Sequence, residues 1–142
     1  MGRIVPALRK MGGRKDQSVQ KIVLLGLAGA LGSLARYGLA GLVQRATPGT
    51  FPLGTFMVNV LGCLAFGFVW GVCENRISLH PDVRVVLLTG FMGAFTTFST
   101  FTFESLGLME TGQWMAFALY AGGQLLLGLV LLWLGLGAGR LV

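Results

Sequence analysis

The stretch "GFMGAFTTFSTFTF", residues 90–103, decides the fold because it lies in the middle of an apolar segment long enough to cross a membrane. It contains five phenylalanines, five hydroxyl residues and two glycines. Hydrocarbon offers no hydrogen-bond partner to a hydroxyl group, so these side chains gain nothing from contact with lipid. We therefore expect the hydroxyls to face neighbouring helices or water.

The composition of the whole chain indicates a membrane protein. Only 11% of the 142 residues are charged, against roughly 25% in ordinary globular proteins, and 54% are hydrophobic. Too few polar side chains are present to cover a folded surface in water. The 23 glycines are spread through the apolar segments, where small residues favour close packing of helices.

Four apolar segments predict an all-α integral membrane protein with four transmembrane helices per subunit. Each segment has at least the ~20 residues that span a bilayer, and together they form one domain, residues 22–142. They cover about residues 22–43, 53–73, 83–109 and 114–139. The first segment is too long for the apolar core of a cleaved secretory signal. Before it lies a basic tail, residues 1–21, which we expect to be disordered or to lie on the membrane surface.

Two structures fit the third segment. A continuous helix over residues 83–109 would be about 40 Å long, against a hydrocarbon core of ~30 Å. Gly90 and Gly93, followed directly by the hydroxyl cluster, favour a break near the middle, where freed backbone carbonyls could bind a cation. The alternative is a continuous helix in which the Thr and Ser hydroxyls bond to carbonyls one turn earlier.

An aromatic stripe is predicted on the third segment. Phe95, Phe98 and Phe101 have the spacing i, i+3 and i+6, which places them along one side of a helix, beside Thr97 and Thr100. The edge of an aromatic ring is positive, so inward-pointing rings could solvate an anion, whereas ring faces would attract a cation. Contact of the rings with lipid or a neighbouring helix is the commoner role of such a stripe.

Three polar residues within the spans are candidates for function. Asn59 fits an interhelical hydrogen bond or a donor that lines a pore. Arg36 lies about 21 Å into the first span, where its charge would need snorkelling or a water-filled vestibule that concentrates anions. Glu104 is the carboxylate deepest in an apolar segment, and it fits a proton or cation site, or a partner of a hydroxyl or of a charge on another span.

Other chemistries find little support. Cys63 and Cys73 lie about 15 Å apart along one predicted helix, too far for a disulfide, and His80 has no second histidine or cysteine nearby to complete a metal site of the usual kind. No hydrolytic triad, paired carboxylates or nucleotide-binding loop is present, so we expect no enzyme. A short basic tail before a span favours contact with anionic lipid over nucleic acid.

Four motifs together resemble the Fluc, or CrcB-type, fluoride channels of bacteria and other microbes. In chain order they are "GALGSLARYGL", "GTFMVNVLGC", "TGFMGAFTTFSTF" and "YAGGQLLLG". The match covers residues 22–142, and the third motif is highly specific. The resemblance implies a passive fluoride-selective channel, embedded in the lipid of the bacterial inner membrane as a multi-pass protein, that exports cytoplasmic fluoride and so reduces its toxicity. It also implies an antiparallel dual-topology homodimer with two fluoride pathways and a structural sodium ion at its centre.

The resemblance assigns roles to residues near the predicted break. Phe98 and Phe101 would line the fluoride pathway with their ring edges, and Asn59 would approach fluoride from the second span. Gly93 and Thr96 would supply backbone carbonyls to the sodium ion.

Further residues are assigned by the same resemblance. Ser99, Thr100 and Tyr120 would form a polar track along the pathway. Gln124 occupies a position in this track that is often Ser or Thr in the family, and it keeps donors and an acceptor on a longer side chain. Arg36 resembles the arginine of the family's vestibule, and Glu104 matches an acid near the pathway.

The charge distribution conflicts with a simple dual topology. Nine of the eleven Lys and Arg lie on the side of the N-terminal tail, which predicts that most copies insert with this terminus in the cytoplasm. An antiparallel homodimer needs both orientations. A translation start at Met11 or an oppositely oriented paralogous partner would reconcile the two.

Two rival functions stay open on the sequence. A small proton-coupled multidrug or cation exporter, also a four-span dimer, would need an acid in its first span, where this chain has Arg36 and no acid. Only Glu104 supports that alternative. A structural subunit without transport activity would explain the glycines and aromatics, but not the hydroxyls at mid-membrane.

Overall fold

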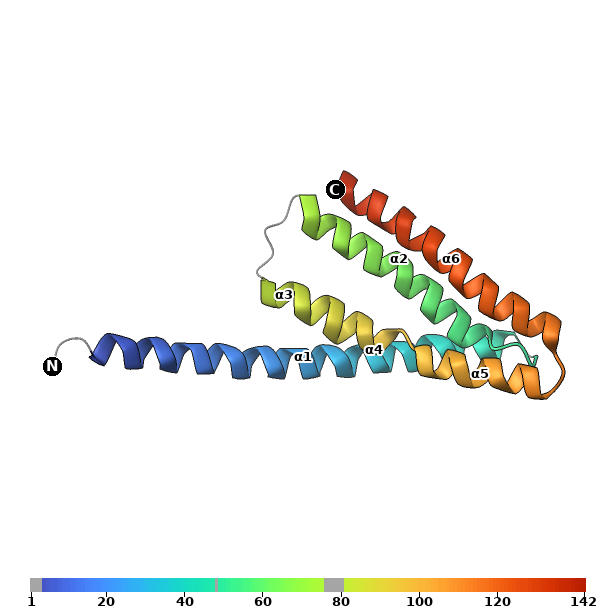
Figure 1. Ribbon diagram of the computed structural model, residues 1–142, viewed down its shortest axis with the longest axis horizontal. Helices are drawn as coiled ribbons and strands as arrows, with labels where there is room; N and C mark the ends of the chain where they lie inside the picture. Colours follow the sequence, from blue (N-terminus) through green and yellow to red (C-terminus); the bar gives the residue numbers. More distant parts are fainter. Residues whose placement is uncertain (1–3, 48, 76–80) are drawn as a thin grey trace.

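The computed structural model describes residues 4–47, 49–75 and 81–142, with side chains from Ser18 onward apart from that of Asn75. The secondary structure of this part of the chain consists of helices joined by short turns (Figure 1). Four stretches of it are long and apolar enough to cross a membrane. They are Ser18–Ala46, Leu53–Glu74, Pro81–Glu110 and Trp114–Leu141. The prediction of an all-α protein with four spans is therefore confirmed.

The first helix, α1 (Ile4–Ala46), is longer than the sequence predicts. Its 43 residues make a rod of about 64 Å, whose N-terminal part extends beyond the other helices (Figure 1). Residues 4–21 belong to this helix, and Pro6 falls in its first turn, where a missing N–H breaks no helical bond. Contact of this part with a membrane surface stays a prediction.

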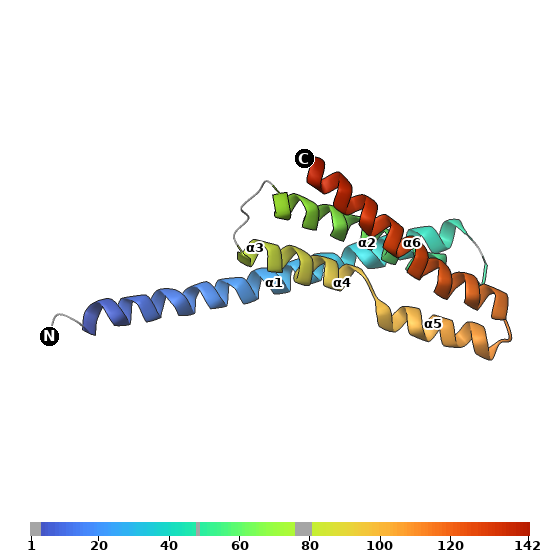
Figure 2. The same ribbon diagram turned by 45° about the horizontal axis from the view of Figure 1, so that its top comes forward.

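Helices α2 (Leu53–Asn75) and α6 (Trp114–Leu141) form the most extensive contact, and they lie side by side in Figures 1 and 2. Glycines make this approach possible. Gly67 of α2 faces the carbonyl of Leu132, and Gly135 of α6 faces the carbonyl of Leu64, so closely that a methyl group on either would overlap the opposite backbone. Each helix repeats the arrangement one turn later, which is the pattern of small residues four apart that packs membrane helices.

The third span is built from four pieces. They are α3 (Pro81–Val85), the π-helix η1 (Val86–Met92), α4 (Gly93–Phe95) and α5 (Phe98–Glu110). Between α4 and α5 the chain is extended, with φ/ψ of −81°/159° at Thr96 and −148°/115° at Thr97. The broken helix is confirmed, and the continuous alternative is wrong.

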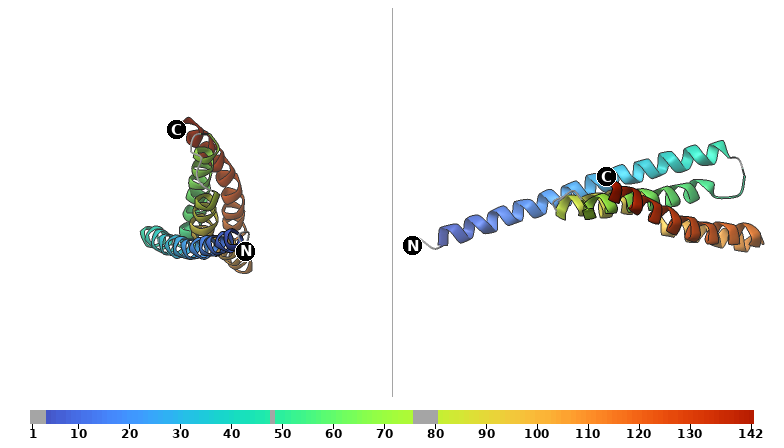
Figure 3. Two further views of the ribbon diagram at one scale, coloured as in Figure 1. Left: turned by 90° about the vertical axis from the view of Figure 1, so that its left-hand side faces the viewer. Right: turned by 90° about the horizontal axis from the view of Figure 1, so that it is seen from above.

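The break separates the packing partners of the third span. Before it, η1 and α4 lie along α1, where Gly32 lets the helix approach the carbonyl of Phe91. After it, α5 packs on α6 instead, and in the right-hand view of Figure 3 α5 and the start of α6 diverge from the C-terminal end of α1. The break therefore opens space on both of its sides, between α1, α2 and α6.

Candidate functional site at the helix break

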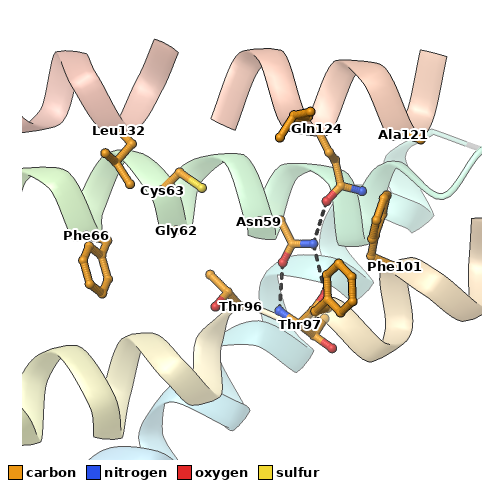
Figure 4. Close-up of a pocket in the computed structure, with 12 residues that line it drawn as sticks. Asn59, Gly62, Cys63, Phe66, Thr96, Thr97, Phe101, Ala121, Gln124 and Leu132 are labelled. Carbon is orange, nitrogen blue, oxygen red and sulfur yellow. Dashed lines mark hydrogen bonds between the residues drawn. The ribbon is translucent and has the colours of Figure 1, made fainter. Parts of the chain in front are cut away.

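Asn59 of α2 holds the break open through a two-point contact with the backbone of one residue, Thr97 (Figure 4). Its Nδ2 donates to the Thr97 carbonyl at 3.1 Å, and its Oδ1 accepts from the Thr97 N–H at 2.8 Å. The second bond satisfies a backbone N–H that would otherwise lack a partner in the membrane. The interhelical hydrogen bond that the sequence offers for Asn59 is present.

Two backbone carbonyls lose their usual donors at the break. In a continuous α-helix the Thr97 N–H would bond to the Gly93 carbonyl and the Thr100 N–H to the Thr96 carbonyl. In the structure the Thr97 N–H bonds to Asn59, and the Thr100 N–H bonds at 3.3 Å to the Thr97 hydroxyl, which caps α5. Gly93 and Thr96 are the two residues that the resemblance links to a sodium ion.

A second amide extends the contact of Asn59 to α6. The remaining N–H of Asn59 donates to Gln124 Oε1 at 2.7 Å. Because the backbone of Thr97 has one donor and one acceptor in known places, it fixes the orientation of the Asn59 amide and, through it, that of Gln124. Gln124 Nε2 then points away from Asn59 and, among the described residues, has no hydrogen-bond partner although the atom is buried.

Glu104 of α5 is bound by two hydroxyls. Thr55 donates to Oε1 at 2.9 Å and Tyr120 to Oε2 at 2.5 Å. Of the partners that the sequence left open for Glu104, the structure shows hydroxyls. Thr55 is a residue that the sequence reasoning missed, although its place four residues before Asn59 puts both polar side chains on one face of α2.

The predicted aromatic stripe is only partly correct. Phe98 and Phe101 lie together on α5, with ring centroids 5.7 Å apart, and Phe101 also lies 5.3 Å from the Tyr120 ring. Phe95 does not continue this stripe, because the extended residues 96 and 97 interrupt the helical periodicity. Its ring stacks instead on Phe91 at 6.0 Å.

Two pockets flank the break. The larger, of about 430 Å³, lies between α2, α5 and α6, and its lining includes Asn59, Phe98, Phe101 and Gln124 (Figure 4). None of the described residues that line it is charged. Thr97 lines this pocket and also the second one.

The second pocket, of about 280 Å³, lies on the α1 side of the break. Arg36 is half-buried in its wall, together with Thr55, Thr97 and Thr100. Ser99, in contrast, is exposed on α5, with its hydroxyl 3.4 Å from that of Thr97. The predicted site residues therefore gather around one break, but Arg36 faces a different pocket from the phenylalanine pair.

This arrangement can solvate a small anion without binding it by charge. The larger pocket is lined by two amide side chains, two threonines and aromatic rings, all of them neutral. A small ion could exchange part of its hydration for such groups and still leave, as conduction requires. The carbonyls freed at Gly93 and Thr96 offer the opposite polarity, suited to a cation.

Comparisons with known proteins point to one family. The family model described as CrcB-like protein, Camphor Resistance (CrcB), matches residues 23–136. A protein of Nitratidesulfovibrio vulgaris strain Miyazaki F, named fluoride-specific ion channel FluC, is 94% identical over 124 residues, 87% of this chain and 100% of its own length. A protein of the same name from Nitratidesulfovibrio vulgaris strain Hildenborough is 51% identical over 87% of this chain and 100% of its own length. Another from Nitrosococcus oceani is 46% identical over 87% of this chain and 98% of its own length.

Proposed function

The chain belongs to the CrcB-like protein family, and we propose that it is a passive, fluoride-selective ion channel through which fluoride leaves the cytoplasm. The observation that carries this proposal is the 94% identity to a relative named fluoride-specific ion channel, over that relative's full length. The names of the relatives favour a channel over the proton-coupled exporter. Glu104, on which the exporter alternative depends, is bound by two hydroxyls of its own subunit.

The residues around the break suit fluoride. Phe98 and Phe101 present their rings to the larger pocket, where positive ring edges would stabilise an anion weakly. Arg36, in the second pocket, would raise the local concentration of anions without standing among the rings. Fluoride would then pass from one neutral donor to the next, and no fixed positive charge would trap it.

An antiparallel homodimer is part of the proposal. Phe98 is 79% exposed and Phe103 77% exposed in one subunit, and the polar Ser99 and Thr102 lie exposed between them at membrane depth. The Thr102 hydroxyl donates to the Phe98 carbonyl at 3.0 Å, but lipid offers Ser99 and Thr102 no further partner, whereas a second copy would cover them. An oppositely oriented paralogue would do the same. The membrane that we propose for this assembly is the bacterial inner membrane.

A structural sodium ion also fits the break. The fit rests on the Gly93 and Thr96 carbonyls, whose helical donors are bound elsewhere. Unwound backbone carbonyls of this kind coordinate sodium in other membrane proteins. In a dimer each subunit would contribute this pair, and the ion would hold the two breaks together.

The test is fluoride efflux from liposomes that contain the purified protein, followed with a fluoride electrode, with chloride as the control anion. We expect rapid fluoride efflux and little chloride efflux. Absence of fluoride efflux, or equal efflux of the two anions, would contradict the proposal. Proton-driven export of a lipophilic cation from the same liposomes would support the exporter instead.

A further inference from the structure

We propose that a groove between the end of α2 and the start of the third span binds the phosphate group of an anionic membrane phospholipid. The groove has a volume of about 240 Å³ and lies on the far side of α2 from the Glu104 cluster. Its lining consists of Phe66 and Trp70 of α2 with Arg84, Val85, Leu88 and Thr89 of the third span. The inference does not depend on the proposed fluoride conduction, because it concerns contact with lipid.

The groove lies at one end of the spans. The helices α2 and α6 end where α3 begins, at the same end of the molecule (Figure 1). Trp70 lies four residues before Glu74, the last residue of its span, a distance of about 6 Å along the axis. Arg84 lies three residues after Pro81, the first residue of the third span. Both side chains therefore belong to the level of the lipid headgroups, where tryptophan and basic residues are typical.

Arg84 is the cation at this end that lacks a carboxylate partner among the described residues. Lys21 binds Asp82 at 2.7 Å, and Arg140 donates twice to Glu74, at 2.7 and 3.0 Å. Glu74 interacts with Arg84 electrostatically, but the described residues form no hydrogen bond or ion pair with this guanidinium. Its N–H groups are therefore available to an anion from outside the subunit.

Trp70 orients this guanidinium before any ligand binds. The Cζ of Arg84 lies 3.8 Å from the centre of the Trp70 ring, which is a cation–π contact. The Trp70 ring itself stacks with that of Phe66, at 6.3 Å between centroids and 12° between planes. A guanidinium stacked by its face keeps the N–H groups of its edge for a phosphate, which arginine binds with two parallel hydrogen bonds.

The rest of the groove suits the body of a lipid. Phe66, Val85 and Leu88 provide an apolar wall for the acyl chains. Thr89 adds an exposed hydroxyl deeper in the span, at the level of the glycerol oxygens. In an α-helix Arg84 and Thr89 would be about 140° apart, but the wider π-helical turn of η1 begins between them, and both line the groove.

These features favour an anionic phospholipid over two other ligands. Free phosphate could bind the guanidinium, but it would leave the apolar wall uncovered. A zwitterionic headgroup would bring an ammonium group to a place where Asp82 and Glu74 already bind cations. Phosphatidylglycerol has the phosphate and the acyl chains without the second charge.

The experiment is native mass spectrometry of the purified full chain in detergent. The protein is titrated with phosphatidylglycerol or with phosphatidylcholine that carries the same acyl chains. We expect phosphatidylglycerol to bind about fivefold more tightly, since one basic residue near the membrane surface contributes about this factor. A large molar excess of inorganic phosphate should not displace it, because phosphate cannot replace the contacts of the acyl chains.

Substitutions locate the site. Arg84→Gln should weaken phosphatidylglycerol binding about tenfold, since a charge-assisted pair of hydrogen bonds is lost. Arg84→Lys keeps the charge without the planar fork, and its affinity should lie between those of Arg84→Gln and wild type. Thr89→Val keeps the shape of an exposed side chain and should weaken binding about threefold. The matched control is Arg45→Gln, which removes a positive charge from the last turn of α1 and should bind like wild type.

Each outcome bears on the inference. Equal affinities of wild type for the two lipids would overturn it, and so would displacement of phosphatidylglycerol by phosphate, since a soluble anion would then suffice. Wild-type affinity in Arg84→Gln would overturn it too, and is the result expected if a second copy of the chain covers the groove. Should Arg84→Gln fail to fold, wild-type affinity in Thr89→Val would count against the site. A failure of fluoride efflux would contradict the proposed function alone.

Discussion

Replacing Gly135 of α6 by alanine tests the packing that holds the candidate site together. A β-carbon at this position would overlap the carbonyl of Leu64 and approach the Phe68 nitrogen to 2.9 Å. Both atoms belong to the α2 backbone, so neither can rotate away. The two helices would have to move apart along their most extensive contact.

The expected magnitude follows from this overlap. Inserting a methyl group into a tightly packed contact costs about 1–3 kcal/mol, and the better helix propensity of alanine returns up to about 1 kcal/mol. Gly137, two residues later on the same helix, provides the matched control because a β-carbon there would meet nothing within 4 Å. Gly137→Ala should therefore be neutral or stabilising, and the two variants should differ by about 1–3 kcal/mol in the free energy of unfolding.

The assay is unfolding of the purified protein by SDS in mixed micelles, followed by tryptophan fluorescence. Wild type, Gly135→Ala and Gly137→Ala should unfold in the order of their predicted stabilities, with Gly135→Ala first. Equal unfolding free energies for the two variants would refute the argument that backbone contact at glycine sets the distance between α2 and α6.

Three further predictions concern the break and the proposed pathway. Asn59→Asp should slow fluoride efflux at least about tenfold. The new carboxylate oxygen would face the Thr97 carbonyl at 3.1 Å and Gln124 Oε1 at 2.7 Å, so two hydrogen bonds would become repulsive contacts. Efflux like that of wild type would contradict this prediction. Phe98→Ile and Phe101→Ile should abolish most fluoride efflux while the dimer survives on size exclusion, whereas Phe103→Ile, on the same helix but outside the pocket lining, should conduct normally. Thr97→Val removes the N-cap of α5 and should destabilise the protein by about 1 kcal/mol, which Thr97→Ser should not; equal stabilities would argue against the cap.

Much of the fold could be read from the sequence, because hydropathy acts over whole segments. Four stretches of about 20 apolar residues can only be membrane helices when so few charges are present, and their ends agree with the structure to within a few residues for three of the four spans. The first helix differs more at its N-terminal end. The helix runs from Ile4 through Gly12 and Gly13 although both are weak helix formers, and hydropathy marks where the lipid ends, not where the helix ends.

The position of the break was only partly predictable. Gly90 and Gly93 pointed to the correct region, but both lie in helical turns, and the extended residues are Thr96 and Thr97. Glycine permits a break without causing one. The break is bound by Asn59, 38 residues earlier in the chain, whose amide oxygen replaces the helical partner of the Thr97 N–H.

The sequence by itself determined the four spans and the set of polar residues that must avoid lipid, including the hydroxyls of residues 90–103. Only the tertiary structure decided which of these groups bond to one another. Asn59 uses both of its N–H groups, one on the Thr97 carbonyl at the break and the other on Gln124 Oε1 of α6. The reason is physical: the partner of a donor is set by its neighbours in space, and Thr97 and Gln124 lie 38 and 65 residues from Asn59 in the sequence.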